Sequence, residues 1–288
     1  MEFEPKIVFT DIDGTLLDKH RGISPATNAA VGKLTERGIP FILISSRMPR
    51  AMTHLQADLS IVGAPLIAYN GGLVLDGQGK TLSSQAILLP VAKHIAQTAS
   101  ALELVVMLYH IDEWYVTERE HYAQREENNT RTEATVQPLA TTLTDWEDRN
   151  IGAHKVMVMG DPGGIDTLVQ QLTKFYGDQL HLYRSKDDYL EIADAQISKL
   201  TGVKTLLEAC YPNLTPADCV AFGDNYNDVE MLEGVGLGVA VANARKEVKA
   251  VADMQVAGNK EDGVAEGLNK IFTQRQRTSG PIPESGMK

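Results

Sequence analysis

The feature that most constrains this sequence is one pattern that occurs at both ends of the chain and is interrupted in the middle. Short apolar runs, each bounded by a helical segment or a turn, lie at residues 6–10, 39–45, 66–69, 220–223, 236–241 and 254–256. Buried strands that alternate with helices are typical of a parallel, doubly wound sheet. Both ends of the chain are therefore predicted to build one α/β core.

The middle of the chain has a different order of predicted strands and helices. A hairpin signal at residues 76–80 is followed by segments with the patterns of strands and helices: strands at 104–109, 113–117, 155–159 and 180–184, and helices at 91–102 and 165–176. We predict an inserted α+β cap at residues 83–189 and a core made of residues 1–82 and 190–272. Residues 273–288 are polar and rich in Gly, Ser and Pro, which predicts a flexible tail.

Composition excludes several classes of protein. The chain has 288 residues, about two domains' worth, with 27 Lys and Arg against 38 Asp and Glu, a net charge of −11. An acidic chain is a poor candidate for binding nucleic acid, which requires clustered positive charge. The sequence has neither an apolar run of about 20 residues nor a signal peptide pattern, and Cys210 and Cys219 match no metal or disulfide spacing. We expect a cytoplasmic protein without nucleic-acid or membrane partners; oligomeric state is not predicted.

A first acidic motif directly follows the first predicted strand, in the segment Asp11-Ile12-Asp13-Gly14. Two carboxylates two residues apart can project to the same side of an extended segment. In open α/β sheets, ligands bind at the carboxyl ends of the strands. Close carboxylates repel unless a cation lies between them, and Mg²⁺ prefers such oxygen ligands. The alternative is a polar turn with two solvated aspartates.

A second acidic motif, Gly223-Asp224-Asn225-Tyr226-Asn227-Asp228, follows a late predicted strand in the same way. It does not match an EF-hand loop, because Tyr226 and Val229 stand where a ligand and a glycine are needed. The alternative is a helix N-terminus carrying acidic residues, which the helix dipole favours. Two such motifs at equivalent strand ends favour a shared divalent cation.

These motifs resemble a known family. Residues 11–16 (DIDGTL) and the pattern Gly223-Asp224-x-x-Asn227-Asp228-x-x-Met231 are similar to the first and last motifs of the haloacid dehalogenase superfamily. The insert, Asn70-Gly71-Gly72 and the segment from Asn259 to Ala265 resemble its Cof-type sugar-phosphatase branch with a type IIB cap. The resemblance extends to about Phe272 and implies a Rossmann-like core.

The resemblance implies roles for four acidic residues. Asp11 would be the nucleophile that forms an aspartyl-phosphate, and Asp13 would protonate the leaving alcohol and then activate water. Mg²⁺ would be held by Asp11, the backbone carbonyl of Asp13 and Asp224, with Asp228 close by, directly or through water.

The resemblance also implies phosphate- and substrate-binding residues. Ser45, at the end of the second strand, would bind the phosphoryl group, followed by Ser46, where the family pattern has glycine, and by Arg47. Arg47 would contact substrate or cap the next helix. Lys199 would be the family's phosphate-binding lysine; the alternative is a surface lysine that opens a helix at 199–210. Asn227 would contact the phosphate or the substrate.

The implied function is Mg²⁺-dependent hydrolysis of small phosphate monoesters, with sugar phosphates as the expected substrates. A phosphomutase and a non-catalytic sugar-phosphate sensor are the alternatives. The cap is expected to close over the substrate. Its polar segment 117–135 could reach over the site through His121 or Arg125.

Overall fold

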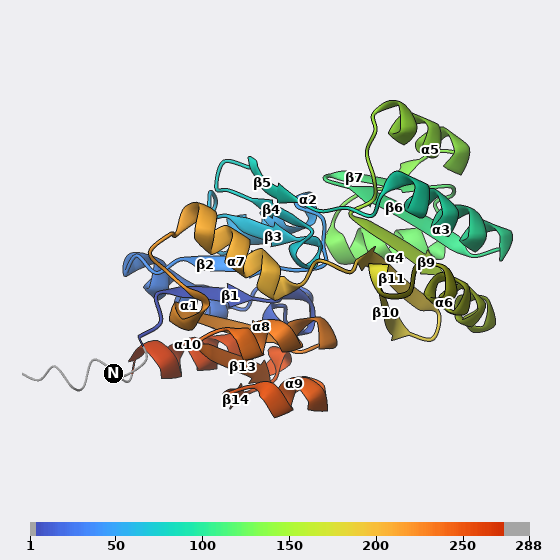
Figure 1. The fold of residues 1–288 in the computed structure, drawn as a ribbon. Coiled ribbons are helices and arrows are strands. Elements are labelled where there is room, and N and C mark those ends of the chain that lie inside the picture. The colour runs from blue at the N-terminus through green and yellow to red at the C-terminus, as the bar shows by residue number, and fades with distance from the viewer. Residues whose placement is uncertain (1–3, 274–288) are drawn as a thin grey trace, which may run out of the picture.

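The computed structural model describes residues 4–273 and contains two sheets (Figure 1). One has eight strands in the order β14-β13-β12-β1-β2-β3-β4-β5, and the other has six in the order β10-β11-β9-β6-β7-β8. Both ends of the chain contribute to the first sheet, and the second is built from the middle. The predicted α/β core with an inserted α+β cap is confirmed.

The core sheet is parallel from β14 to β3 and antiparallel from β3 to β5. Its strands are β1 (Ile7–Thr10), β2 (Phe41–Ile44), β3 (Leu66–Ala68), β4 (Leu73–Leu75), β5 (Thr81–Ser84), β12 (Cys219–Gly223), β13 (Leu237–Val241) and β14 (Met254–Val256). The central strands β1, β2 and β12 are wholly buried. Such continuous apolar runs are typical of parallel strands covered on both faces.

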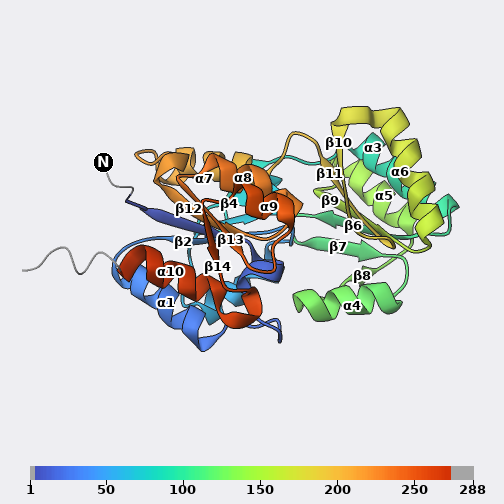
Figure 2. The ribbon, with the colours of Figure 1, turned by 90° about the horizontal axis from the view of Figure 1, so that it is seen from below.

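Helices cover both faces of the core sheet. They are α1 (Pro25–Glu36), α2 (Arg50–Asp58), α7 (Lys199–Cys210), α8 (Val229–Gly234), α9 (Lys246–Val251) and α10 (Gly263–Thr273). Figure 2 shows α1 and α10 together on one face and α7 and α8 on the other. Short helical turns are η1 (Ile12–Leu16), η2 (Tyr69–Gly71), η4 (Pro216–Asp218), η5 (Tyr226–Asp228) and η6 (Asn259–Glu261).

The starts of two core helices are fixed by capping side chains. Ser24 accepts a hydrogen bond from the Thr27 backbone and precedes Pro25, which confirms the predicted start of α1. Ser198 caps α7 in the same way: its Oγ accepts a hydrogen bond from the Thr201 backbone N–H. The Thr201 hydroxyl in turn donates to the Ser198 carbonyl. The cap at Ser198 places Lys199 in the first turn of α7.

The cap sheet is mainly antiparallel. Its strands are β6 (Val105–His110), β7 (Glu113–Val116), β8 (Thr135–Val136), β9 (Lys155–Met159), β10 (Leu180–Lys186) and β11 (Tyr189–Asp194); its helices are α3 (Leu89–Ala101), α4 (His121–Thr130), α5 (Leu139–Asp148), α6 (Pro162–Tyr176) and the turn η3 (Gly177–Gln179). Figure 2 shows α3, α5 and α6 on one side of this sheet and α4 on the other.

The two faces of the cap sheet pack against different neighbours. Alternate residues such as Val156 and Val158 lie in the cap's own apolar cluster under its helices. Their neighbours Met157 and Met159 instead join the apolar cluster of the core. This period of two is what a strand with two different faces requires. The cap therefore turns this face of its sheet toward the core, and α4 lies on the same side (Figure 2).

The predicted domain boundaries need correction. We expected the cap at residues 83–189, but β5 continues the core sheet to Ser84, and β11 pairs with β9 and β10 in the cap sheet as far as Asp194. The return to the core at residue 190 was wrong because a short apolar strand does not indicate its sheet. The hairpin between β10 and β11 holds β11 in the cap. Apart from Thr273, which ends α10, the predicted tail at 273–288 lies outside the described residues.

Two further observations complete the fold. Helix α5 was not predicted, because its sequence LATTLTDWED contains three threonines, which are weak helix formers. Among residues 4–273, the helices are all too short or too polar to cross a bilayer.

Candidate active site

The site lies where neighbouring core strands end. Strand β1 pairs with β12 on one side and β2 on the other, all parallel, so their carboxyl ends share one edge of the sheet. Asp11 follows β1, Ser45 follows β2 and Asp224 follows β12. The start of α7 brings Lys199 to the same edge. This is the place at which open α/β sheets bind ligands.

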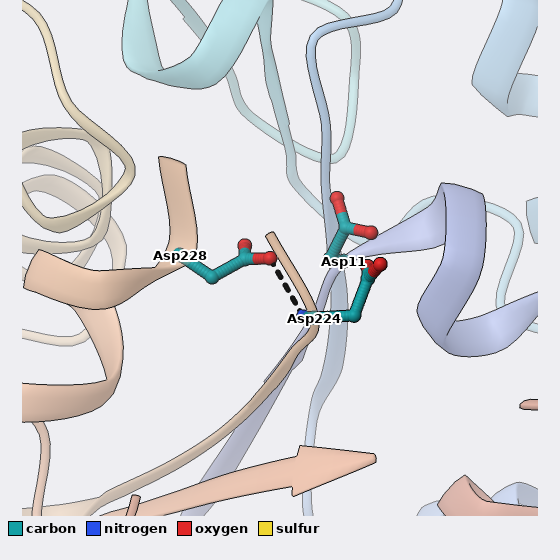
Figure 3. Close-up of side chains that lie close together, drawn as sticks. All are labelled: Asp11, Asp224 and Asp228. Atoms are coloured by element: carbon teal, nitrogen blue, oxygen red, sulfur yellow. Dashed lines mark hydrogen bonds between the residues drawn. The ribbon is translucent and has the colours of Figure 1, made fainter. Parts of the chain in front are cut away.

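Three carboxylates converge at this edge. Asp11, Asp224 and Asp228 each present a carboxylate oxygen, and these atoms all lie within 4.8 Å of one another. In Figure 3, Asp228 reaches from its own turn toward Asp224, where its Oδ2 accepts a hydrogen bond of 2.8 Å from the Asp224 backbone N–H. Residues some two hundred positions apart thus form one cluster. The predicted convergence of the two acidic motifs is seen in the structure.

Glycines make room for this cluster. Gly14 has φ +90°, and a Cβ there would lie 2.5 Å from Asp224 Oδ2. A Cβ at Gly223 would lie 2.5 Å from the Cβ of Asp228. Any larger residue at either position would push a carboxylate away, so both glycines are needed for the close approach of the acids.

Lys199 joins two of the three acids, Asp11 and Asp228. Its side chain is fully buried, and its Nζ donates hydrogen bonds of 2.5 Å to Asp11 Oδ1 and Asp228 Oδ1. Although burial disfavours the ammonium, the charges of Asp11 and Asp228 raise the pKa of Lys199, so the side chain stays charged. The alternative of a surface lysine at the start of α7 was wrong. The predicted helix 199–210 is confirmed.

The cluster carries more negative than positive charge. Burial raises the pKa of Asp11 well above its usual range; Lys199 opposes this, whereas Asp228 and Asp224 add to it. Burial and the charge of Asp228 raise the pKa of Asp224 to about 6. Three acids around one lysine leave an excess of oxygen ligands and negative charge. This donor set fits a hard divalent cation such as Mg²⁺.

Asp13 faces different partners from Asp11. Its carboxylate accepts hydrogen bonds from Arg47 Nε at 2.7 Å, Arg47 Nη2 at 2.8 Å and Arg21 Nη2 at 2.5 Å. Although partial burial favours the neutral acid, these two arginines lower the pKa of Asp13 below its ordinary value. Its carboxylate thus lies outside the group of three acids. The metal contact expected through its backbone carbonyl stays a prediction.

The segment after β2 contains the predicted phosphate-binding residues. Ser45 is buried, and its Oγ accepts a hydrogen bond of 3.3 Å from the Arg47 backbone. Ser46 borders the cavity described below. Arg47 has a role that neither alternative described: it holds Asp13, and its Nη1 donates to the Ala51 carbonyl at 3.1 Å. The second arginine on Asp13, Arg21, was not predicted.

Asn227 contacts Asn70, whose place in the site was not predicted. Its Nδ2 donates to Asn70 Oδ1 at 3.0 Å, and Asn70 Nδ2 donates to Glu191 Oε1 of the cap at 3.2 Å. Asn70 is buried in the left-handed conformation, φ 55°, and its backbone N–H donates to the Ser45 carbonyl. The Asn70-Gly71 pair after a buried strand was the available signal, because Asn tolerates this conformation.

A cavity of about 350 Å³ lies between the core and the cap. Core residues on its wall include Asp13, Ser46, Arg47, Asn70 and Asn227, and cap residues include Glu126, Lys155, Tyr189 and Glu191. The size and the polar wall suit a small polar molecule. The cap residues were not predicted. The available signal was a charged side chain in a mainly apolar strand, Lys155 in β9 and Glu191 in β11.

Two loose candidates in the cap do not reach the site. Among the residues that the structure describes, the cavity wall includes neither His121 nor Arg125. The exposed His121 ring lies 2.9 Å from Glu120 Oε2, and the Arg125 guanidinium stacks over the rings of Tyr122 and Tyr189. The helix that carries them, α4, contributes Glu126, Asn129 and Thr130 to the wall instead.

Comparison with known proteins gives consistent matches. Residues 8–268 match the family model described as haloacid dehalogenase-like hydrolase. A Haemophilus influenzae protein that bears a provisional name as a phosphatase is 31% identical over 278 residues, 93% of this chain and 99% of the relative. The HMP-PP phosphatase of Yersinia pestis is 26% identical over 274 residues, 94% of this chain and 97% of the relative. A haloacid dehalogenase-like hydrolase from Bacteroides thetaiotaomicron has the same fold, with a TM-score of 0.85 and 26% identity over 93% of this chain and all of that chain.

Proposed function

Since the chain belongs to the haloacid dehalogenase-like hydrolases and is a phosphatase of that family, we propose that it hydrolyses small phosphate monoesters, sugar phosphates among them, in a Mg²⁺-dependent reaction. The observation that carries this proposal is the cluster of Asp11, Asp224 and Asp228, with the buried Lys199 bonded to two of the three. A nucleophile, a cation site and a fixed positive charge lie together at one strand edge. The resemblance of the motifs at Asp11 and Asp224 is thereby supported by geometry.

In the proposed reaction, Asp11 attacks the phosphorus atom with a carboxylate oxygen. The new bond joins Asp11 to phosphorus as the ester bond to the leaving oxygen breaks, and Asp13 gives that oxygen a proton. Asp13 then takes a proton from water, whose oxygen attacks the aspartyl-phosphate and releases phosphate and free Asp11. Covalent catalysis divides one difficult displacement into two easier ones.

The surroundings of Asp13 suit the second of its two roles. Arg47 and Arg21 favour its ionised form, which is the form that accepts a proton from water. A phosphoryl group in the cavity would compete for the same guanidinium groups, because Arg binds phosphate oxygens well. Asp13 borders the cavity, where the leaving group would lie.

Positive partners for the phosphoryl group come from both the protein and the metal. Asp11, Asp224 and Asp228, with the backbone carbonyl of Asp13, would hold Mg²⁺, which neutralises charge on phosphoryl oxygens when bound. Lys199 supplies a fixed charge, and we propose that Ser45 and Asn227 donate hydrogen bonds to the phosphoryl group. A metal and a lysine that dominate locally let an acidic chain bind an anion.

Two further observations bear on the substrate and its compartment. The cavity of about 350 Å³ suits a small molecule, and the Yersinia pestis relative is named for a phosphatase activity. We also propose a cytoplasmic location, which the two unpaired cysteines Cys210 and Cys219 support.

Turnover of the purified chain tests the proposal. We expect inorganic phosphate to be released from p-nitrophenyl phosphate and from members of a sugar-phosphate panel with Mg²⁺, and little release with EDTA. Asp11→Asn should abolish turnover, whereas Asp58→Asn, an exposed aspartate at the end of α2, should not. Turnover by Asp11→Asn, or equal turnover without metal, would contradict the mechanism. An isomerised sugar phosphate without phosphate release would indicate a mutase.

A further inference from the structure

Two charged cap residues face the cavity from neighbouring strands. Lys155 begins β9 and Glu191 lies in β11, and both border the cavity. In the antiparallel register Glu191 pairs with Met157, which lies two residues from Lys155 on the same face. Lys155 and Glu191 are therefore diagonal neighbours on the sheet face that turns to the core. Lys155 is only 4% exposed.

Each charge contacts the core next to a phosphate-site residue. Lys155 Nζ donates to the Ser46 carbonyl at 3.0 Å, and Ser46 follows Ser45. Glu191 Oε1 accepts from Asn70 Nδ2 at 3.2 Å, and Asn70 in turn accepts from Asn227. Both cap side chains thus lie beside the segments that hold the phosphoryl group. A leaving group attached to that phosphoryl group would lie in the cavity that both side chains border.

Lys155 Nζ also lies 4.5 Å from the centroid of the Tyr109 ring, but both charged side chains keep hydrogen-bonding capacity beyond these contacts. An ammonium group has three N–H donors, and a carboxylate has about four acceptor sites. Burying charged groups that are incompletely paired costs free energy unless a ligand completes the pairing. Burial raises the pKa of Glu191, and the charge of Lys155 opposes this effect. Their diagonal positions on neighbouring strands let the two groups act as one recognition element.

The opposite charges restrict the chemistry of the ligand. Lys155 would attract a second anionic group, but Glu191 would repel it. A cationic group would be attracted by Glu191 and repelled by Lys155. A hydroxyl group suits both, because it donates to a carboxylate and accepts from an ammonium. The wall as a whole carries more basic than acidic residues, but this pair of one acid and one base favours a neutral, hydroxylated group at its own position.

We propose that Glu191 and Lys155 determine specificity by binding hydroxyl groups close to the ester oxygen of the leaving group. The inference rests on the proposed phosphatase function and names the cap residues that select the substrate. Glu191 accepts a hydrogen bond from such a hydroxyl, and Lys155 donates one. A site built to hydrogen-bond a hydroxyl discriminates against an analogue that lacks it.

The test compares two phosphate esters that differ only in hydroxyl groups, glycerol 1-phosphate and propyl phosphate, with the full chain and Mg²⁺. We expect wild-type kcat/KM to favour glycerol 1-phosphate by at least about tenfold. Glu191→Met and Lys155→Met should each reduce that preference to within about threefold, chiefly by lowering kcat/KM for the hydroxylated ester. Glu191→Gln, which keeps the shape of the side chain, serves if Glu191→Met does not fold.

Lys93→Met and Glu147→Gln are matched controls, because this exposed pair, 3.2 Å apart, joins two cap helices and is absent from the cavity wall. Both should retain the wild-type preference. The inference is overturned by a wild-type enzyme that turns over both esters equally, by a preference that survives in both cavity variants, or by equal losses on both esters. Folded wild-type protein without turnover of any ester would overturn the phosphatase proposal as well.

Discussion

The ion pairs at the strand ends of the core differ from those on the outer surface of the cap. In the core, Lys199 and Asp228 are fully buried, Asp11 is almost buried, and the three are joined by direct hydrogen bonds. In the cap, typical ion pairs such as Arg149 with Glu113 are about one-third exposed on both sides. Buried ion pairs have a large desolvation cost, whereas exposed pairs contribute little. The core therefore retains costly charges where the proposed reaction needs them.

The two sheets explain where each kind of charge can lie. Parallel strands bring their carboxyl ends to one edge, so the core gathers Asp11, Ser45 and Asp224 at a point. The antiparallel cap sheet instead offers a face, on which Lys155 and Glu191 border the cavity, whereas Asp11 is not part of the cavity wall. Residues gathered at one place can act together on a single reacting group, whereas residues spread over a sheet face can contact different parts of a leaving group.

The strongest test of this contrast removes the central cation of the core. Lys199→Met leaves two buried carboxylates without their partner, so we expect the free energy of unfolding to fall by about 3–5 kcal/mol without metal. Urea unfolding in EDTA measures this change. Lys204→Met, at an exposed position of the same helix, should change stability by less than about 0.5 kcal/mol. Equal stabilities of the two variants would mean that the buried cluster is not held by Lys199.

The two arginines on Asp13 give a second comparison. Arg47 is 4% exposed and Arg21 is 43% exposed, so the charge of Arg47 is screened less by water. We expect Arg47→Met to lower kcat by about 10–100-fold and Arg21→Met by less than about threefold, in steady-state assays with p-nitrophenyl phosphate. The reverse order would show that the exposed arginine, and not the buried one, positions Asp13.

The crowded acids predict a pH dependence of the metal-free core. The pKa of Asp224 is raised to about 6, so between about pH 4 and 6 the folded protein retains a proton that the unfolded chain has lost. The free energy of unfolding contributed by Asp224 therefore falls as pH rises through this window and stays low above it. In EDTA at pH 7.5, Asp224→Asn should be more stable than wild type by about 1–2 kcal/mol.

Thermal unfolding at pH 5 and pH 7.5 measures this effect. The difference between Asp224→Asn and wild type should be smaller at pH 5, and added Mg²⁺ should stabilise wild type more than the variant. A variant less stable than wild type in EDTA at both pH values would show that Asp224 is not strained by its neighbours.

The smallest effect is expected on the surface of the cap. Arg149 donates to Glu113 at 2.6 Å and to Asp145 at 2.8 Å, but its side chain is 38% exposed. Arg149→Met should lower the free energy of unfolding by less than about 1 kcal/mol and leave kcat unchanged. A loss above about 2 kcal/mol, measured by urea unfolding, would remove the distinction between buried core charges and exposed cap charges.

Much of the core could be predicted because its signals are local. A polar residue directly after a buried strand marks a strand end, and sheet topology then brings Asp11 and Asp224 together. A serine before a proline fixed the start of α1. The cap was harder: the apolar run in β11 suited either sheet, and only pairing with β9 and β10 assigns it.

The sequence by itself determined the parallel core, the acidic residues at its strand ends and the presence of an insert, because each depends on patterns within a few residues. Only the tertiary structure decided that Lys199 is buried between two aspartates, that Arg47 holds Asp13, and that Lys155 and Glu191 face the cavity. These contacts join elements far apart in the chain. Their formation depends on how two sheets pack, which no local pattern specifies.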